Sequence, residues 1–120
     1  MLSKKRRVSR KEFPDIISKG KRYNSPHLLL YVAPINRNNE NIQSKFSFSV
    51  SKKVCKNAVD RNKNRRRGYS VVNHLTKKIK LGLFCFFVFK KGAGVVDFKT
   101  LEKEITELLS VSLVLFPVLS

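Results

Sequence analysis

The chain has 120 residues, 42% of them hydrophobic, and its 26 Lys and Arg side chains against 8 Asp and Glu give a net charge of +18 at pH 7. This length suits one domain over residues 1–120 with its own core, and the apolar content excludes a disordered basic tail protein. So strong a positive charge favours nucleic acid as the partner, with an anionic membrane surface as the second choice.

The charge is unevenly distributed along the chain. Nine Lys and Arg residues lie between Lys4 and Arg22 and eleven between Lys52 and Lys80, whereas four of the eight acids lie between Asp97 and Glu107. The first ninety residues are therefore expected to present the cationic surface, and the last thirty to form a near-neutral packing element.

The two cysteines, Cys55 and Cys85, do not have the spacing of a metal site, and the first residues lack the apolar stretch of a secretory signal. We therefore expect a cytoplasmic, reducing location. Cys85 lies within seven consecutive apolar residues and is expected to fill the core. Cys55 has no base close to it in the sequence, so it carries little weight as a nucleophile.

Residues 1–8 are basic with few apolar anchors, which fits either an arm that orders on a phosphate backbone or a solvated tail. A short helix is expected over 9–20, because Ser9 and Glu12 have capping-box spacing and Gly20 suits a left-handed helix end. Pro14 moves the expected start of the helix towards Phe13.

Apolar residues of this first helix share one face at helical spacing. They are Phe13 and Ile17, together with Ile16 at its margin. We expect this face to pack against the rest of the domain.

Two strands are expected next, over 27–33 and 45–51, joined by a polar, turn-rich loop. The second alternates strictly and should turn Phe46, Phe48 and Val50 to a core. Its other face carries Ser47, Ser49 and Ser51, whose small hydroxyls either leave room for a ligand or simply face solvent.

A strongly basic helix is expected from about residue 56 to 76. Between Lys52 and Arg67 eight residues are Lys or Arg, and only Asp60 opposes them. At 100° per residue, one sector holds cations where a core helix would carry Leu and Ile; its members are Ala58, Arg61, Arg65, Tyr69 and Val72, with Asn62 and Arg66 at the edge. Apolar packing returns in the second half, with Val71, Val72, Leu75 and Ile79, so the first half is left for binding. A merely solvated face would intersperse Glu with Lys.

The remaining chain predicts a strand over 83–89 buried on both faces, then a helix capped by Asp97. One side of that helix is apolar, with Phe98, Leu101, Ile105, Leu108 and Leu109. The apolar tail 111–120 is too short to span a bilayer, and its role is not assigned. The order helix, strand, strand, helix, strand, helix is typical of an α+β sandwich with helices against one mixed sheet.

The basic stretch resembles the signature of the bacterial ribonuclease P protein subunit, which reads approximately SVSKK, a Gly-containing turn, AV, any residue, RN, and then a Lys-Arg pair. Residues 49–53 (SVSKK) match, as do Ala58, Val59, Arg61 and Asn62, and Arg65 and Arg66 stand at the pair. The resemblance extends over most of the chain, because Phe13, Gly20 and Tyr31 also fall at family positions.

The chain departs from the family pattern at three places. Cys55 and Lys56 stand where the family has Gly, Tyr69 and Ser70 where it commonly has Arg and an acid or amide, and Ile17 where it frequently has Phe.

The resemblance implies a two-layer α+β sandwich in which a mixed four-stranded sheet packs with about three helices. It also implies a left-handed crossover for the strand, basic helix, strand unit, opposite to the general rule for parallel crossovers. The implied function is that of a protein subunit that binds the catalytic ribonuclease P RNA and helps it remove the 5′ leader from precursor tRNA.

On this resemblance the protein has no catalytic residue and binds no metal by itself, since Mg²⁺ held by the RNA carries out the hydrolysis. Phosphate contacts to the RNA are assigned to Lys52, Lys53, Lys56, Arg61, Arg65, Arg66 and Arg67, with Asn62 as a hydrogen-bonding partner. The leader groove is assigned to Phe13, Ile17, Tyr31, Ser49 and Ser51, although Phe13 equally suits a core position. Neither a membrane nor an obligate protein partner is expected.

The main alternative is a small ribosomal protein that binds RNA structurally. It explains the charge equally well, but it accounts less well for the signature coupled to an upstream aromatic helix. A membrane-surface protein is the third interpretation, and it is weakened because the basic helix lacks a broad apolar face.

Overall fold

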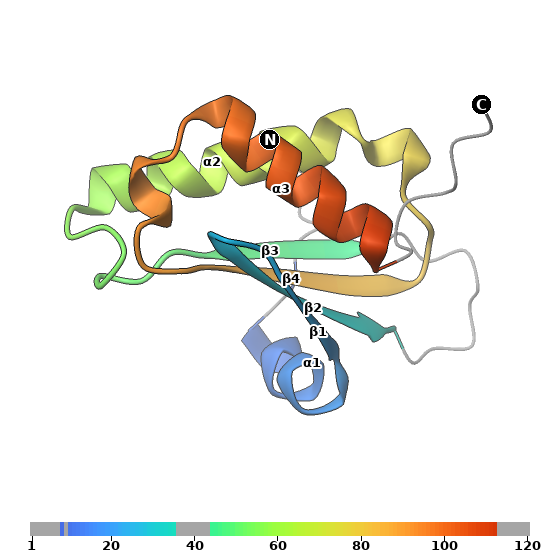
Figure 1. Cartoon of the computed structure of the whole chain (residues 1–120). Helices are drawn as coiled ribbons and strands as arrows, with labels where there is room; N and C mark the ends of the chain where they lie inside the picture. Colours follow the sequence, from blue (N-terminus) through green and yellow to red (C-terminus); the bar gives the residue numbers. More distant parts are fainter. Residues whose placement is uncertain (1–7, 9, 36–43, 113–120) are drawn as a thin grey trace.

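The computed structural model describes residues 8, 10–35 and 44–112, which form a four-stranded sheet covered on one face by α2 and α3 and partly covered on the other by α1 (Figure 1). The strand order is β1-β2-β4-β3, and only the pairing of β3 with β4 is parallel. The strands are β1 (Lys21–Asn24), β2 (Leu28–Pro34), β3 (Lys45–Ser49) and β4 (Leu83–Phe89). The helices are α1 (Phe13–Lys19), α2 (Ala58–His74) and α3 (Phe98–Val111). This is the expected α+β architecture.

Strand β1 is absent from the elements expected from sequence periodicity. Its four residues are Lys21 to Asn24, and three of them are exposed. Such a polar segment has no strand pattern, and it becomes a strand because β2 supplies antiparallel hydrogen bonds at the edge of the sheet. The tertiary partner, rather than local propensity, makes this strand.

Helix α1 begins at Phe13, after a short turn at Arg10–Glu12, as Pro14 in its first turn indicated. The proposed capping residue Ser9 lies outside the described residues. The expectation for Gly20 was wrong: its φ is −76°, which is not left-handed. Gly20 is instead closely packed, since a Cβ there would lie 2.4 Å from the Ile16 carbonyl oxygen.

The inward face of α1 also differs from the expectation. Ile16 is fully buried, whereas Ile17 is 52% exposed. Ile16 and Phe13 pack with Phe84 and Phe86 against the sheet. Helix α1 is therefore rotated about its own axis relative to the predicted orientation, so that Ile16 instead of Ile17 faces the sheet.

The connection between β3 and β4 has the unusual hand implied by the resemblance. In Figure 1 both strands run from right to left, and α2 returns above the sheet from left to right. Helix α2 packs on β3 at the back and α3 on β2 at the front, so β4 lies in front of β3. The crossover is therefore left-handed, against the general rule.

The main core lies between the sheet and the α2–α3 layer. Phe46, Phe48 and Val50 are buried there, as the alternation of β3 predicted. Cys85 on β4 is fully buried, and burial raises the pKa of its thiol, so it acts as a core residue.

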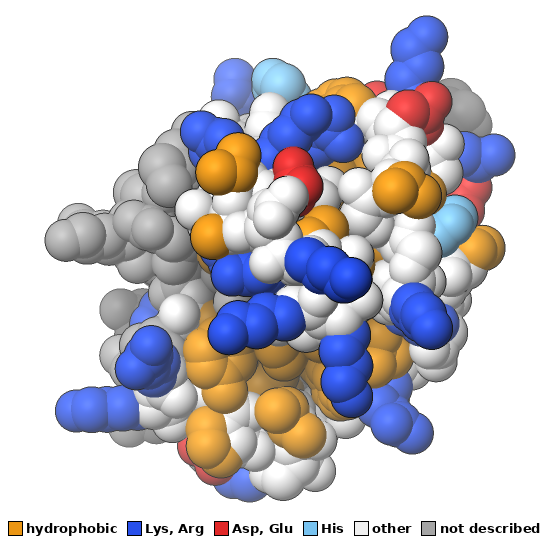
Figure 2. All heavy atoms as spheres, turned by 90° about the vertical axis from the view of Figure 1, so that its left-hand side faces the viewer, with side chains coloured by type: hydrophobic (Ala, Val, Ile, Leu, Met, Phe, Trp, Pro, Cys, Tyr) orange, Lys and Arg blue, Asp and Glu red, His pale blue; other side chains and the backbone are white. Residues whose placement is uncertain are grey.

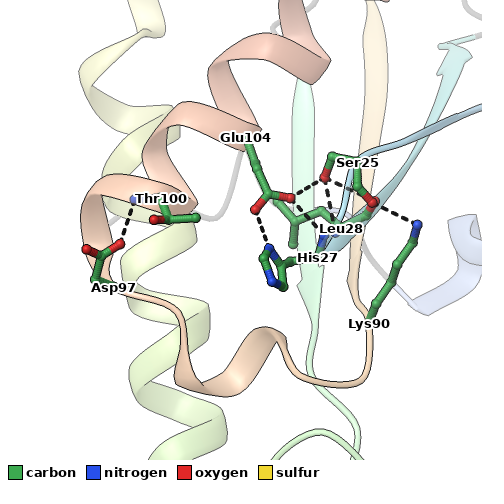
Figure 3. Close-up of polar contacts among 7 residues, drawn as sticks. All are labelled: Ser25, His27, Leu28, Lys90, Asp97, Thr100 and Glu104. Carbon is green, nitrogen blue, oxygen red and sulfur yellow. Dashed lines mark hydrogen bonds and ion pairs between the residues drawn. The ribbon is translucent and has the colours of Figure 1, made fainter.

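Helix α3 is capped as expected, because the Asp97 side chain accepts a hydrogen bond from the Thr100 N–H at 2.9 Å (Figure 3). Its predicted apolar side is confirmed: Leu101, Ile105, Leu108 and Leu109 are buried and Phe98 packs at the margin. No helix among the described residues is long and apolar enough to cross a membrane.

Glu104 of α3 fixes that helix to the turn between β1 and β2 (Figure 3). Its carboxylate accepts hydrogen bonds from the Ser25 hydroxyl and the His27 backbone N–H, and its Oε2 lies 2.6 Å from His27 Nδ1. Burial raises the pKa of Glu104, but the hydrogen bonds from Ser25 and His27 outweigh it and leave the pKa below its ordinary value. Lys90 Nζ, just after the end of β4, holds the same turn by donating a hydrogen bond to the Ser25 carbonyl oxygen.

Candidate nucleic-acid interface

The buried face of α2 is made by small and polar residues instead of a stripe of large apolar side chains. It consists of Asn64, Gly68, Val71 and Val72. The two valines confirm that the second half of the helix anchors it by apolar packing. The first half, which holds Arg61, Arg65 and Arg66, buries only Asn64.

Gly68 allows α2 to lie close to β3. A Cβ at this position would lie 2.5 Å from the ring carbons of Phe48. The same ring stacks on Phe87 of β4, with centroids 4.8 Å apart, and meets the edge of Tyr69 at 5.0 Å. The basic helix is therefore held against the aromatic core at Gly68 and Tyr69.

The loop 51–57 between β3 and α2 carries Lys52, Lys53 and Lys56, which are all exposed. Arg61 holds this loop, because its Nη1 donates to the carbonyl oxygens of Cys55 at 3.0 Å and Lys56 at 2.8 Å. Arg61 thus uses part of its guanidinium on the protein backbone and is only partly exposed. It positions the loop lysines as well as adding a positive charge.

The other candidate RNA contacts lie along the first half of α2. Asn62 and Arg66 are exposed, and Arg65 and Arg67 are half-buried. Arg65 donates to Asn62 Oδ1, and Arg67 donates to the Val96 carbonyl oxygen at 3.4 Å. The structure therefore brings the predicted cations together on the loop and on two successive turns of one helix.

Figure 2 views the side of the molecule where this loop and the start of α2 lie. Lys and Arg side chains are scattered over this side from the top to the middle and along both edges, and hydrophobic side chains gather below the centre. In the described part of loop 51–57 and α2, Asp60 is the single acid. Such a concentration of positive charge attracts a polyanion such as a nucleic-acid backbone.

The α1-side face of the sheet carries a cluster of aromatic rings. Phe86 is central: its centroid lies 4.9 Å from that of Phe13 and 5.9 Å from that of Tyr31, with the Tyr31 ring nearly parallel. Ser47 is level with Phe86 in the strand register and is buried. The predicted groove residues Phe13 and Tyr31 therefore belong to one aromatic surface.

The other predicted groove residues lie around this surface. Ser49 is half-buried and pairs in register with Val88, one step along the strands from Phe86. Ile17 stands exposed on α1, and Ser51 is exposed in the loop after β3. Ser51 is therefore part of the basic loop 51–57 and not of the strand that carries Ser47 and Ser49.

Among the described residues, no group of three or more His, Cys, Asp and Glu side chains lies close enough to share a metal ion. His74 is exposed, and His27 is bound to Glu104.

Comparison with known proteins identifies the family. The family model for ribonuclease P matches residues 1–112. The chain belongs to the ribonuclease P protein family. It is 31% identical over 100 residues to the ribonuclease P protein component of Microcystis aeruginosa, covering 83% of each chain. It is 34% identical over 99 residues to that of Clostridium botulinum, covering 82% of this chain and 86% of the relative.

Solved structures of ribonuclease P proteins share the fold. The Staphylococcus aureus protein superimposes with a TM-score of 0.79 at 23% identity, covering 94% of this chain and 99% of that one. The Thermotoga maritima protein gives 0.76 at 21% identity, covering 88% and 96%. Family membership decides for the ribonuclease P subunit over the ribosomal interpretation.

Cys55, one of the residues at which the chain departs from the expected pattern, is packed on two sides. Cys55 is buried, and its Sγ lies 3.4 Å from Asn64 Nδ2. On its other side the thiol meets Gly94, where a Cβ would lie 2.5 Å from Sγ. Packing between the loop, α2 and Gly94 therefore fixes this turn.

Sequence patterns gave no individual role to three residues of the basic helix and the aromatic surface. Phe86 is the centre of the aromatic surface, Asn64 holds Cys55, and Val59 is an exposed apolar residue among the cations. Alternation within residues 83–89 could have assigned Phe86 to one face, but not to the face of Tyr31. That assignment needs the strand register.

Proposed function

We propose that the chain binds ribonuclease P RNA through loop 51–57 and the first half of α2, and that it assists removal of the 5′ leader from precursor tRNA. The observation that carries the proposal is the gathering of Lys and Arg side chains on loop 51–57 and α2, opposed in that segment only by Asp60, in a member of this family. Arginine guanidinium groups suit phosphate oxygens because they donate two parallel hydrogen bonds.

The half-buried rings of Phe13 and Tyr31, which pack around the buried Phe86, would receive the single-stranded leader. Aromatic rings stack with any base, so the groove would accept leaders of different sequence. The half-buried hydroxyl of Ser49 lies at its border and would hydrogen-bond to the leader backbone.

The chemistry would be carried by the RNA, with Mg²⁺ held by the RNA at the scissile phosphodiester. The protein's own residues would contribute charge neutralisation and substrate positioning. We place this activity in the cytoplasm and propose that it needs no further protein partner.

Reconstitution tests the proposal. Purified protein is added to a ribonuclease P RNA at low Mg²⁺, and cleavage of the 5′ leader of a precursor tRNA is measured. We expect stimulation by the protein, while an equal concentration of a simple polycation serves as the control. Absence of stimulation beyond that control would contradict the proposal.

Salt dependence gives a second test. If six or more phosphates are engaged, affinity for the RNA should fall by about 10³-fold or more between 50 and 200 mM salt. Filter binding across that range measures the slope. A shallow slope would argue against α2 as the RNA-binding surface.

A further inference from the structure

The outer side of α2 carries a shallow hollow whose lining is partly apolar. Its residues are Val59, Asn62, Arg65, Arg66 and Tyr69. Val59 is 72% exposed in the first turn of the helix. Phosphate binding explains the arginines, but it gives no reason for an exposed valine and a tyrosine among them.

The tyrosine is fixed in place from below. The edge-to-face contact with Phe48, at 5.0 Å and 79°, orients the Tyr69 ring, and Gly68 brings the helix close enough for this contact. Tyr69 is only half-buried, so part of the ring remains available on the side of the hollow. A pre-oriented ring loses little entropy when a second flat group stacks on it.

The polar lining also has a defined arrangement. Asn62 Oδ1 accepts a hydrogen bond from Arg65 Nη1. This contact leaves the amide N–H groups of the exposed Asn62 to donate to a ligand. Arg66 is exposed at the same rim.

We propose that this hollow binds one unpaired nucleobase of the RNA, with its flat face against Val59 and Tyr69. This inference rests on the proposed binding of RNA by α2. Arg65 and Arg66 then neutralise the phosphates beside that nucleotide, and Asn62 donates to the edge of the base. A paired base could not enter, because neighbouring base pairs cover its faces.

Val59→Ser is the sharpest test, because Val59 is exposed and its change should not disturb the fold. Val95→Ser is the matched control, since Val95 is 91% exposed outside the hollow. We expect Val59→Ser to weaken binding to ribonuclease P RNA about threefold to tenfold, and Val95→Ser to leave it unchanged. Tyr69→Leu should weaken binding at least as much, while Tyr69→Phe should retain most of it.

The salt slope separates base stacking from charge. Val59→Ser should lower affinity by the same factor at every salt concentration, since no charge is lost. Arg66→Gln should instead make the salt dependence shallower, by about 0.7–0.9 in the logarithmic slope.

A short single-stranded RNA containing 2-aminopurine provides a direct probe. Its fluorescence should fall on binding to the wild-type protein and fall less with Val59→Ser, whereas affinity for the same RNA annealed to its complement should be equal for both proteins. Equal losses for Val59→Ser and Val95→Ser, or equal effects on single-stranded and paired RNA, would overturn the inference. Failure of the wild-type protein to bind ribonuclease P RNA would instead overturn the proposed function.

Discussion

Helices α2 and α3 lie side by side over the same face of the sheet, yet they bury different chemistry (Figure 1). Helix α3 buries four large aliphatic side chains and the hydrogen-bonded Glu104, whereas α2 buries two valines, a glycine and Asn64. Asn64 Oδ1 has no hydrogen-bond partner among the described residues, a cost of about 1–3 kcal/mol. Helix α3 therefore stabilises the domain by apolar burial, while α2 has a less apolar buried face and presents cations.

The largest effect should come from removing apolar contact on α3. Ile105 is fully buried, so Ile105→Ala should lower the free energy of unfolding by about 2–5 kcal/mol. Urea denaturation measures this change, with the exposed Glu102→Ala as the control on the same helix. RNA affinity of the folded fraction should not change, and a selective loss of affinity would break the division of roles.

Glu104→Gln should remove the acid sensitivity that the Glu104 carboxylate contributes. The folded-state pKa of Glu104 lies below its ordinary value of 4.5, so its stabilisation is present above that pH and is lost as pH falls through the folded-state pKa. At pH 7 the variant should be less stable by about 1.5–3 kcal/mol, since charge-assisted hydrogen bonds from Ser25 and His27 are weakened. Urea denaturation at pH 7 and below pH 4.5 should show this difference shrinking, and a constant difference would contradict the assignment.

Gly68→Ala tests how closely α2 must lie against β3. The new Cβ would meet the Phe48 ring, so the ring or the helix must shift, at a cost of about 1–3 kcal/mol. Thermal unfolding measures the loss, with Lys63→Ala as an exposed control on the same helix. Since alanine favours helices over glycine by about 1 kcal/mol, a gain in stability would show that the ring moves at no cost.

The smallest effect is expected from removing a single charge, and it tests directly whether RNA binds to α2 or to α3. Arg65→Ala on α2 should weaken binding to ribonuclease P RNA about tenfold, whereas Lys99→Ala on α3 should change it little. Both variants should unfold at the wild-type temperature, because neither side chain is buried in the core. Equal losses of RNA affinity would contradict the localisation of binding to α2.

Sequence patterns were enough to predict the strongly periodic elements and to indicate the family. The apolar run of β4, the alternation of β3 and the stripe of α3 each follow from which residues can be removed from water. The cationic stretch and its signature indicated RNA binding for a similar reason, because uncompensated charge needs a polyanion. Residues 1–7 and 113–120, most of the predicted arm and tail, lie outside the described residues.

Three other features depend on contacts between residues that are far apart in the chain. Strand β1 exists because β2 pairs with it. Ile16 is buried instead of Ile17 because α1 packs its Ile16 side against Phe84 and Phe86. The hollow on α2 likewise depends on Phe48 of β3, whose ring orients the Tyr69 ring. Local pattern specifies which side chains avoid water, but only long-range packing specifies which partners they meet and which faces stay open.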